Sequence, residues 1–189
     1  MKAYQALPEG YREILSIDLK NDKKLFWTIN GICIAIMALM ILFASGKGLL
    51  LTMFTPIEGL WLRLLMLGAG MLLYIVLHEG VHGIAMKLCG TKKVKFGFGG
   101  GYAYAGSNDC YDKWGYLMIA LAPVLLWGVV LAVLCLAVPP EWFFVVYLIQ
   151  IFNVSGAAGD FYVTFRFISL PADILVHDSG TCMKVYSKA

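Results

Sequence analysis

The chain has 189 residues, of which 60% are hydrophobic and only 14% are charged. Soluble globular domains carry about 25% charged residues, so this charge content and the mean hydropathy of +0.77 exclude an ordinary soluble domain. The same balance excludes a disordered chain, and a net charge of only +3 without a basic, aromatic-studded surface argues against nucleic-acid binding. An integral membrane protein is the class that remains.

Four apolar segments are long enough to cross a bilayer, with a polar segment at each end of the chain. We therefore expect a single, mainly α-helical membrane domain with four transmembrane helices. In chain order the segments are a polar N-terminal part (1–24), the spans 25–45, 60–89, 114–138 and 141–170, and a polar tail (171–189).

Residues 92–106, between the second and third spans, differ in kind from the apolar segments. Val94, Phe96 and Phe98 alternate with polar or small residues before a run of glycines, which predicts a short β-hairpin. An open strand edge accepts an extended peptide by main-chain hydrogen bonding, so we expect residues 93–104 to bind a peptide substrate in this way. The alternative is a plain cytoplasmic loop that covers the site.

Basic residues indicate the orientation of the spans in the cell membrane. They are concentrated in the N-terminal segment, the hairpin region and the tail, whereas the other two connections carry only Lys47. Because cytoplasmic loops are enriched in Lys and Arg, we expect both termini in the cytoplasm. Four tryptophans near the starts of the spans fit the lipid–water interface: Trp27, Trp61, Trp114 and Trp142.

The second span ends in an H-E-x-x-H motif formed by His78, Glu79 and His82. On a helix, residues i and i+4 share a face, so both imidazoles can bind one Zn²⁺ ion while Glu79 acts as general base toward a water at the metal. Ionisable residues inside a membrane span are costly and usually functional. The alternative is a pair of helix-packing histidines. Five cysteines without a C-x-x-C pair argue against a thiolate zinc site.

A zinc site of this kind needs a third protein ligand, for which Asp160 and His177 are the candidates. His78 lies 17 residues after Trp61, and Asp160 lies 18 residues after Trp142. At about 1.5 Å per residue, both side chains lie about 26 Å below the outer interface, so their depths match. His177 requires a folded-back tail, and depth therefore favours Asp160.

Asn153 precedes Asp160 by seven residues, which places it two turns away on nearly the same helix face. A side-chain amide there can hold a substrate carbonyl or the developing oxyanion. An interhelical hydrogen bond explains it equally well. Small residues at 155–159 allow close helix packing or local unwinding near the metal.

These features together resemble the site-2 protease class of intramembrane zinc metalloproteases. The resemblance covers about residues 60–171 and is carried by the motif at 78–82, the glycine-rich β segment at 96–104, Asn153 and Asp160. It implies that Asp160 is the third zinc ligand and that the β segment lies beside the substrate. The short chain and its tail are similar to small bacterial zincin membrane peptidases.

The function expected from the sequence is an intramembrane zinc endopeptidase that cleaves a membrane-embedded or membrane-proximal peptide near the cytoplasmic face. A non-catalytic metal-binding scaffold or pseudoprotease is the alternative, although zinc binding alone does not need Glu79. A metal transporter needs polar residues along a path across the membrane, and the first and third spans carry no charged residue. The sequence indicates neither the substrate nor the oligomeric state.

Overall fold

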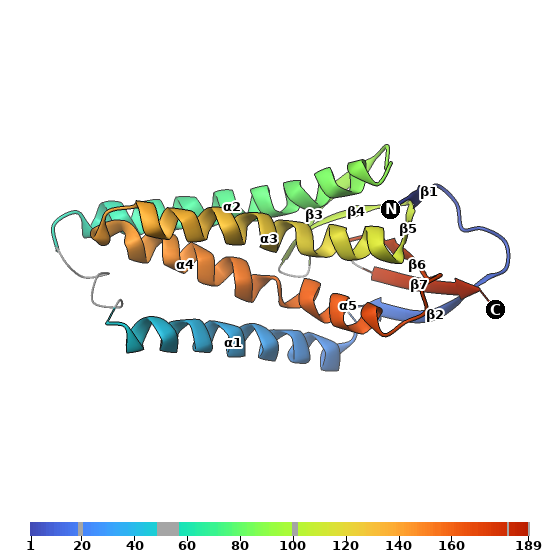
Figure 1. The fold of residues 1–189 in the computed structure, drawn as a ribbon, viewed down its shortest axis with the longest axis horizontal. Helices are drawn as coiled ribbons and strands as arrows, with labels where there is room; N and C mark the ends of the chain where they lie inside the picture. The colour runs from blue at the N-terminus through green and yellow to red at the C-terminus, as the bar shows by residue number, and fades with distance from the viewer. Residues whose placement is uncertain (19–20, 49–56, 100–101, 181, 189) are drawn as a thin grey trace. The chain divides into compact units, whose positions relative to one another are not determined.

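A computed structural model describes residues 1–18, 21–48, 57–99, 102–180 and 182–188 (Figure 1). The structure is mainly helical, and four of its helical segments are long and apolar enough to cross a membrane, as the sequence predicts. These segments are α1 (Lys23–Gly46), α2 (Leu60–Leu88), α3 (Lys113–Ala137) and the consecutive pair α4 (Pro140–Gly156) and α5 (Ala158–Ile168).

The fourth helical segment is broken at Ala157, between α4 and α5. α4 begins with a proline at its first position and Glu141 in its first turn, both of which suit a helix N-terminus. The break falls within the run of small residues at 155–159. It places Asp160 in the first turn of α5, where the helix dipole favours a carboxylate.

The predicted hairpin is present as two antiparallel strands, β3 (Val94–Gly99) and β4 (Tyr102–Ser107). Val94 pairs with Ser107 at the open end, and Gly99 pairs with Tyr102 at the closed end. The predicted glycine turn at 100–101 lies outside the described residues.

A second sheet has five strands in the order β1-β5-β6-β7-β2, and the sequence analysis did not predict it. It joins the two segments that we described only as polar, at the start and end of the chain, through antiparallel pairing of Tyr11 with Lys188 and of Asp18 with Cys182. Its strands are β1 (Ala3–Tyr4), β2 (Tyr11–Asp18), β5 (Cys110–Asp112), β6 (Leu175–Asp178) and β7 (Cys182–Lys188).

The chain forms two compact units. The first comprises residues 1–29, 78–123 and 159–189 and includes every strand that the structure describes; the second comprises residues 30–77 and 124–158. The prediction of a single membrane domain therefore stays a prediction, and each unit is described by itself.

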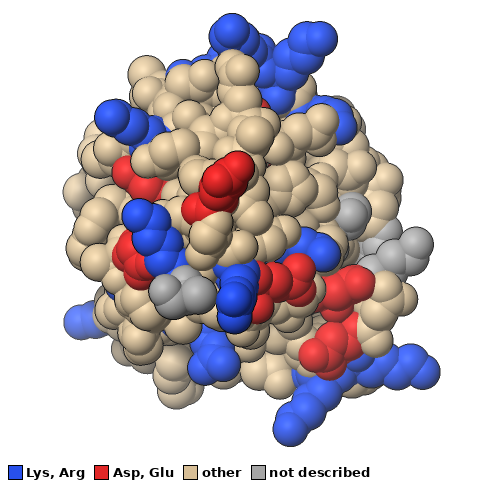
Figure 2. Space-filling model, turned by 90° about the vertical axis from the view of Figure 1, so that its right-hand side faces the viewer, with Lys and Arg blue, Asp and Glu red and all other residues tan. Residues whose placement is uncertain are grey.

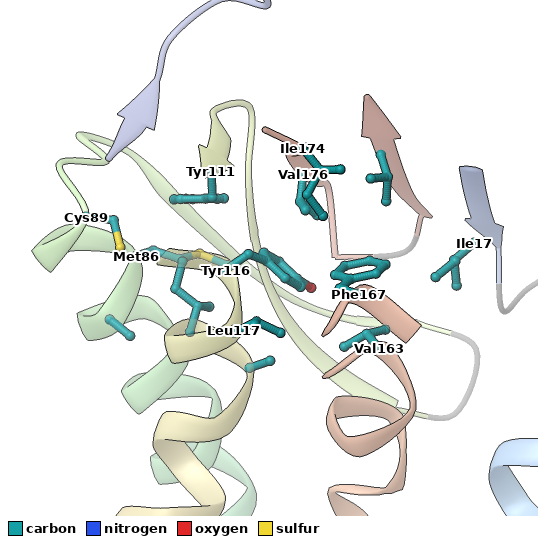
Figure 3. Packing of buried hydrophobic residues seen from close by; sticks show 14 of the residues in the cluster. Ile17, Met86, Cys89, Tyr111, Tyr116, Leu117, Val163, Phe167, Ile174 and Val176 are labelled. Carbon is teal, nitrogen blue, oxygen red and sulfur yellow. The ribbon is translucent and has the colours of Figure 1, made fainter. Parts of the chain in front are cut away.

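Aromatic and aliphatic side chains form the core of the first unit (Figure 3). The ring of Tyr116 on α3 lies beside that of Phe167 on α5, with their centroids 5.6 Å apart. Tyr111 and Val176 bring the five-stranded sheet into the same cluster, and both are fully buried. This core fixes α3, α5 and the sheet around the end of α2 that carries the motif.

A smaller cluster forms the core of the second unit, with Ala44, Tyr147 and Ile151 at its centre. The Tyr147 hydroxyl donates a hydrogen bond of 2.9 Å to the backbone oxygen of Met40, which joins α4 to α1. A buried hydroxyl of this kind needs a partner, and a helix carbonyl supplies it.

Candidate metal centre

The two motif histidines lie one above the other on α2. Their ring centroids are 4.9 Å apart, and the ligand atoms of His78, Glu79 and His82 all lie within 4.8 Å of one another. The i, i+4 spacing of a regular helix explains this arrangement. The sequence-predicted motif therefore forms one compact group of potential metal-ligating atoms.

Asp160 lies against both imidazoles, although it is on a different helix. Its Oδ2 is 3.6 Å from Nε2 of His78, and its Oδ1 is 3.7 Å from Nε2 of His82. Ligands about 2.0–2.1 Å from a tetrahedral zinc ion lie about 3.3 Å from each other. The two imidazole nitrogens each lie slightly farther than this from an oxygen of the Asp160 carboxylate, and two histidines with one carboxylate are a donor set that zinc binds.

His177 lies elsewhere in the same unit. It is on β6, paired with Cys110 of β5 and Lys184 of β7. Among the described residues, no ion pair joins His177 to the motif, whereas Asp160 makes two such contacts. Of the two candidates for the third ligand, the structure thus brings Asp160 to the motif.

His82 is held by a backbone carbonyl of the neighbouring helix. Its Nδ1 lies 2.9 Å from the oxygen of Ile119 on α3. A carbonyl only accepts hydrogen bonds, so Nδ1 is the donor in this contact, and Nε2, on the side of Asp160, is the nitrogen that would bind a metal. The sequence analysis did not identify Ile119, because a backbone carbonyl has no side-chain signature.

The hairpin lies along α2 beside the motif. The Glu79 carboxylate accepts a hydrogen bond from the backbone N–H of Ala105 on β4. One turn further on, a Cβ added to Gly83 would lie 2.5 Å from Cζ of Phe96 on β3, so the ring packs directly on the helix backbone. The β segment thus lies beside the motif, and its expected position beside a substrate stays a prediction.

A buried hydroxyl network holds the end of β4. The hydroxyl of Tyr111 is 2.6 Å from Oγ1 of Thr91, which follows α2, and 2.7 Å from Oγ of Ser107 at the end of β4. All three side chains are buried. Fully satisfied buried networks of this kind favour one arrangement of the groups that they join, here α2, β4 and β5.

The turn between β6 and β7 supports β4 from a second direction. A Cβ added to Gly106 would lie 2.5 Å from the backbone of Ser179, and one added to Gly180 would overlap the ring of Tyr104. Asp178 shapes this turn, since it accepts hydrogen bonds from the Gly180 N–H at 2.8 Å and from Tyr116 on α3 at 2.6 Å. Burial raises the pKa of the Asp178 carboxyl, although these hydrogen bonds oppose the shift.

Lys113 anchors the helix that carries Asp160. Its Nζ donates to the carbonyl oxygens of Ile168, at 2.9 Å, and Leu170, at 2.6 Å, at the C-terminal end of α5. A cation at a helix C-terminus bonds the last carbonyls and is stabilised by the helix dipole. From the sequence, Lys113 is only one of the basic residues of the hairpin region, whereas in the structure it is buried and joins α3 to α5.

Asn153 belongs to the second unit, where it is fully buried. Its side-chain oxygen accepts a hydrogen bond of 2.8 Å from the Tyr74 hydroxyl, and its nitrogen donates to the oxygen of Val124 at 3.4 Å and to Gln150 at 3.3 Å. These contacts match the interhelical alternative. A role for Asn153 in binding substrate stays a prediction.

A family model matches residues 71–175, which contain the motif, the hairpin and Asp160, and the family is described as "Putative zincin peptidase". The chain belongs to this family. Membership indicates a zinc-dependent peptidase, and the donor set of two histidines and a carboxylate agrees with zinc chemistry.

One curated relative extends the comparison. The chain is 30% identical over 119 residues to the "Uncharacterized 24.7 kDa protein in gap 5'region" of Pyrococcus woesei. The match covers 60% of this chain and 51% of the relative, so the chain spans about half the length of the curated relative that it matches. No solved structure matches the chain.

Proposed function

We propose that this zincin family member is an intramembrane endopeptidase of the site-2 protease type, which cleaves a membrane-embedded or membrane-proximal peptide near the cytoplasmic face. The observation that carries the proposal is the meeting of His78, Glu79, His82 and Asp160 on helices apolar enough to span a bilayer. Ionisable side chains inside apolar spans are costly and usually mark a functional site.

The surfaces of the helices support the membrane location. Large apolar side chains are exposed along α2, among them Trp61, Leu65, Leu72, Leu73 and Val76. Continuous exposed apolar surface is unfavourable in water and is the normal outer surface of a helix in lipid. By contrast with α2, the face shown in Figure 2, which is the right-hand side of Figure 1, carries many Lys, Arg, Asp and Glu side chains.

The residues of the site have separate roles in peptide hydrolysis. Zinc, when bound, supplies a Lewis acid that polarises the reacting water and the substrate carbonyl. His78, His82 and Asp160 hold the ion. The Glu79 carboxylate takes a proton from the attacking water as the oxygen bonds to the carbonyl carbon, and it returns the proton to the leaving amine nitrogen as the C–N bond breaks.

The hairpin offers two strand edges to an extended substrate. The N–H of Ala105 is directed at Glu79 and therefore away from β3, its partner strand. In an antiparallel ladder this direction repeats at every second pair. The pairs of Val94 with Ser107 and of Phe98 with Ala103 therefore also direct their N–H groups away from the partner strand. The outer edge of β4 therefore runs beside the catalytic glutamate. We propose that a substrate strand pairs within residues 93–104.

Glu79→Gln tests the activity, because the amide keeps the shape of the side chain but cannot accept the proton from water. The wild-type and variant proteins are purified in detergent, their zinc content is measured, and each is incubated with a tryptic peptide library made from total membrane protein. New N-termini are identified by mass spectrometry. We expect both proteins to bind zinc, and cleavage by the variant to fall by about 10²–10⁴-fold.

Two results contradict the proposal. Equal cleavage by the two proteins removes Glu79 from the mechanism. Stoichiometric zinc in the wild-type protein without any cleavage that depends on Glu79 favours the metal-binding scaffold instead.

A further inference from the structure

A proline lies inside α3, and it is fully buried. In an α-helix the N–H of residue i bonds to the carbonyl oxygen of residue i−4. Proline has no N–H, so Pro123 leaves the carbonyl of Ile119 without its usual helical donor. Ile119 is the residue whose carbonyl oxygen lies 2.9 Å from Nδ1 of His82.

We propose that Pro123 is a positioning residue for the metal ligand His82. By withholding a backbone donor, it frees the carbonyl of Ile119 to accept the Nδ1–H of the imidazole, which fixes the ring and its tautomer. The proposal rests on the proposed zinc site. It gives Pro123 a role in metal binding, although Pro123 is not itself a ligand.

The geometry around His82 shows why this acceptor matters. With the proton on Nδ1, the lone pair of Nε2 is available on the side of Asp160, whose Oδ1 is 3.7 Å away. The opposite tautomer would direct an N–H there and block the metal. Hydrogen-bond partners behind a ligating histidine contribute in this way, and their loss typically costs about 10–100-fold in metal affinity.

A kink is the competing explanation for a proline in a helix, because the ring also displaces the carbonyl of residue i−4 sterically. The two explanations differ in what a shifted proline should do. A kink survives when the proline moves by one residue along α3. The carbonyl that is freed then belongs to Ala120 instead of Ile119, and it points about 100° further around the helix.

Pro123→Ala restores the N–H that competes for the Ile119 carbonyl. We expect zinc affinity, measured against a competing chelator dye, to fall by about 10–100-fold. We also expect ¹⁵N NMR of the histidine-labelled, zinc-free protein in detergent to show a smaller Nδ1–H fraction at His82, assigned by comparison with His82→Asn. Alanine is the better helix former, so the melting temperature should stay the same or rise, which separates this effect from unfolding.

The double variant Pro123→Ala/Val124→Pro is the matched control. It keeps a proline in α3 and frees the Ala120 carbonyl, and we expect it to leave the zinc affinity low. Restored affinity overturns the proposal in favour of a kink, as does wild-type affinity in Pro123→Ala.

The wild-type spectrum is a test that needs no variant to fold, because a dominant Nε2–H tautomer at His82 in the zinc-free chain also overturns the proposal. The same measurements separate a failure of this proposal from a failure of the proposed peptidase activity. A wild-type protein that holds zinc with the predicted tautomer and cleaves nothing leaves the role of Pro123 intact.

Discussion

Asp160 is a carboxylate in a largely enclosed place between two imidazoles, with its side chain 22% exposed. An ionised carboxylate loses hydration when it is buried and needs charged or hydrogen-bonding partners in return. His78 and His82 approach it from one side, and the first turn of α5 adds a favourable dipole. Zinc bound by these three residues would account for the carboxylate at this position.

Asp160→Ala should remove both zinc and activity, since two imidazoles alone leave the metal under-coordinated. His177→Ala and Arg166→Ala should retain zinc, because the carboxylate that faces the imidazoles of His78 and His82 is that of Asp160. Zinc content per chain after purification in detergent gives the measurement. If Asp160→Ala keeps one zinc per chain while His177→Ala loses it, the tail histidine is the ligand and the assignment of Asp160 is wrong.

At the scale of elements, the hairpin depends on a helix position that carries no side chain. Phe96 packs onto Gly83, whereas Gly80, on the preceding turn of the same helix, has open space where a Cβ would be. The two glycines therefore form a natural pair for separating packing from helix propensity.

Gly83→Ala should displace the ring of Phe96 and with it β3, which lowers cleavage by about 10-fold or more while zinc content stays at one per chain. Gly80→Ala should have little effect on cleavage, because nothing lies within 4 Å of its added Cβ. Cleavage rates of both variants on the same peptide give the comparison. Equal rates for the two variants would mean that Phe96 does not position the hairpin for catalysis.

The turn between β6 and β7 makes a second prediction at this scale. Gly180 and Gly10 both have positive φ, at 90° and 83°, which costs a side chain about 1–2 kcal/mol in either position. Only at Gly180 does the added Cβ also overlap Tyr104, whereas Gly10 has nothing within 4 Å. Gly180→Ala should thus lower the free energy of unfolding in detergent by about 1–3 kcal/mol more than Gly10→Ala. Equal losses would show that the turn does not hold Tyr104.

Strand pairing by the substrate is tested with proline, which removes a backbone donor. The outward N–H groups include those of Phe96 and Phe98 on β3 and of Ala103 on β4, so proline at these three positions spares the ladder between the two strands. We expect proline at the edge used by the substrate to lower cleavage by at least 10-fold, with zinc still bound. Normal turnover in all three variants would refute pairing at either edge.

At the scale of the whole molecule, the distribution of basic residues predicts that both termini face the cytoplasm. Ser187 in the tail is buried and bonded to Asp173, so an exposed neighbour, Lys188, is the better site for a cysteine probe. In intact cells, Lys188→Cys should resist a membrane-impermeant thiol reagent until the cells are opened, and Glu58→Cys should react at once. The unmodified chain measures background labelling, and the opposite pattern would invert the topology.

The sequence alone determined the four apolar segments, the motif helix and the β-hairpin. The motif needs no tertiary information, because the i, i+4 periodicity of a helix brings His78 and His82 together by itself. The position of Asp160 beside the motif was also predicted from the sequence, since residues at matching depth in two spans are able to meet.

Only the tertiary structure decided the contacts made by backbone groups and by segments far apart in the chain. The five-stranded sheet pairs Tyr11 with Lys188, and such short strands of mixed polarity carry no periodic signal until their distant partners cover them. The links from Ile119 to His82 and from Ala105 to Glu79 use main-chain atoms, which every residue possesses. In the sequence, Pro123 is one residue of an apolar run. That it frees a carbonyl for His82 follows only from the fold, which places the carbonyl of Ile119 against that imidazole.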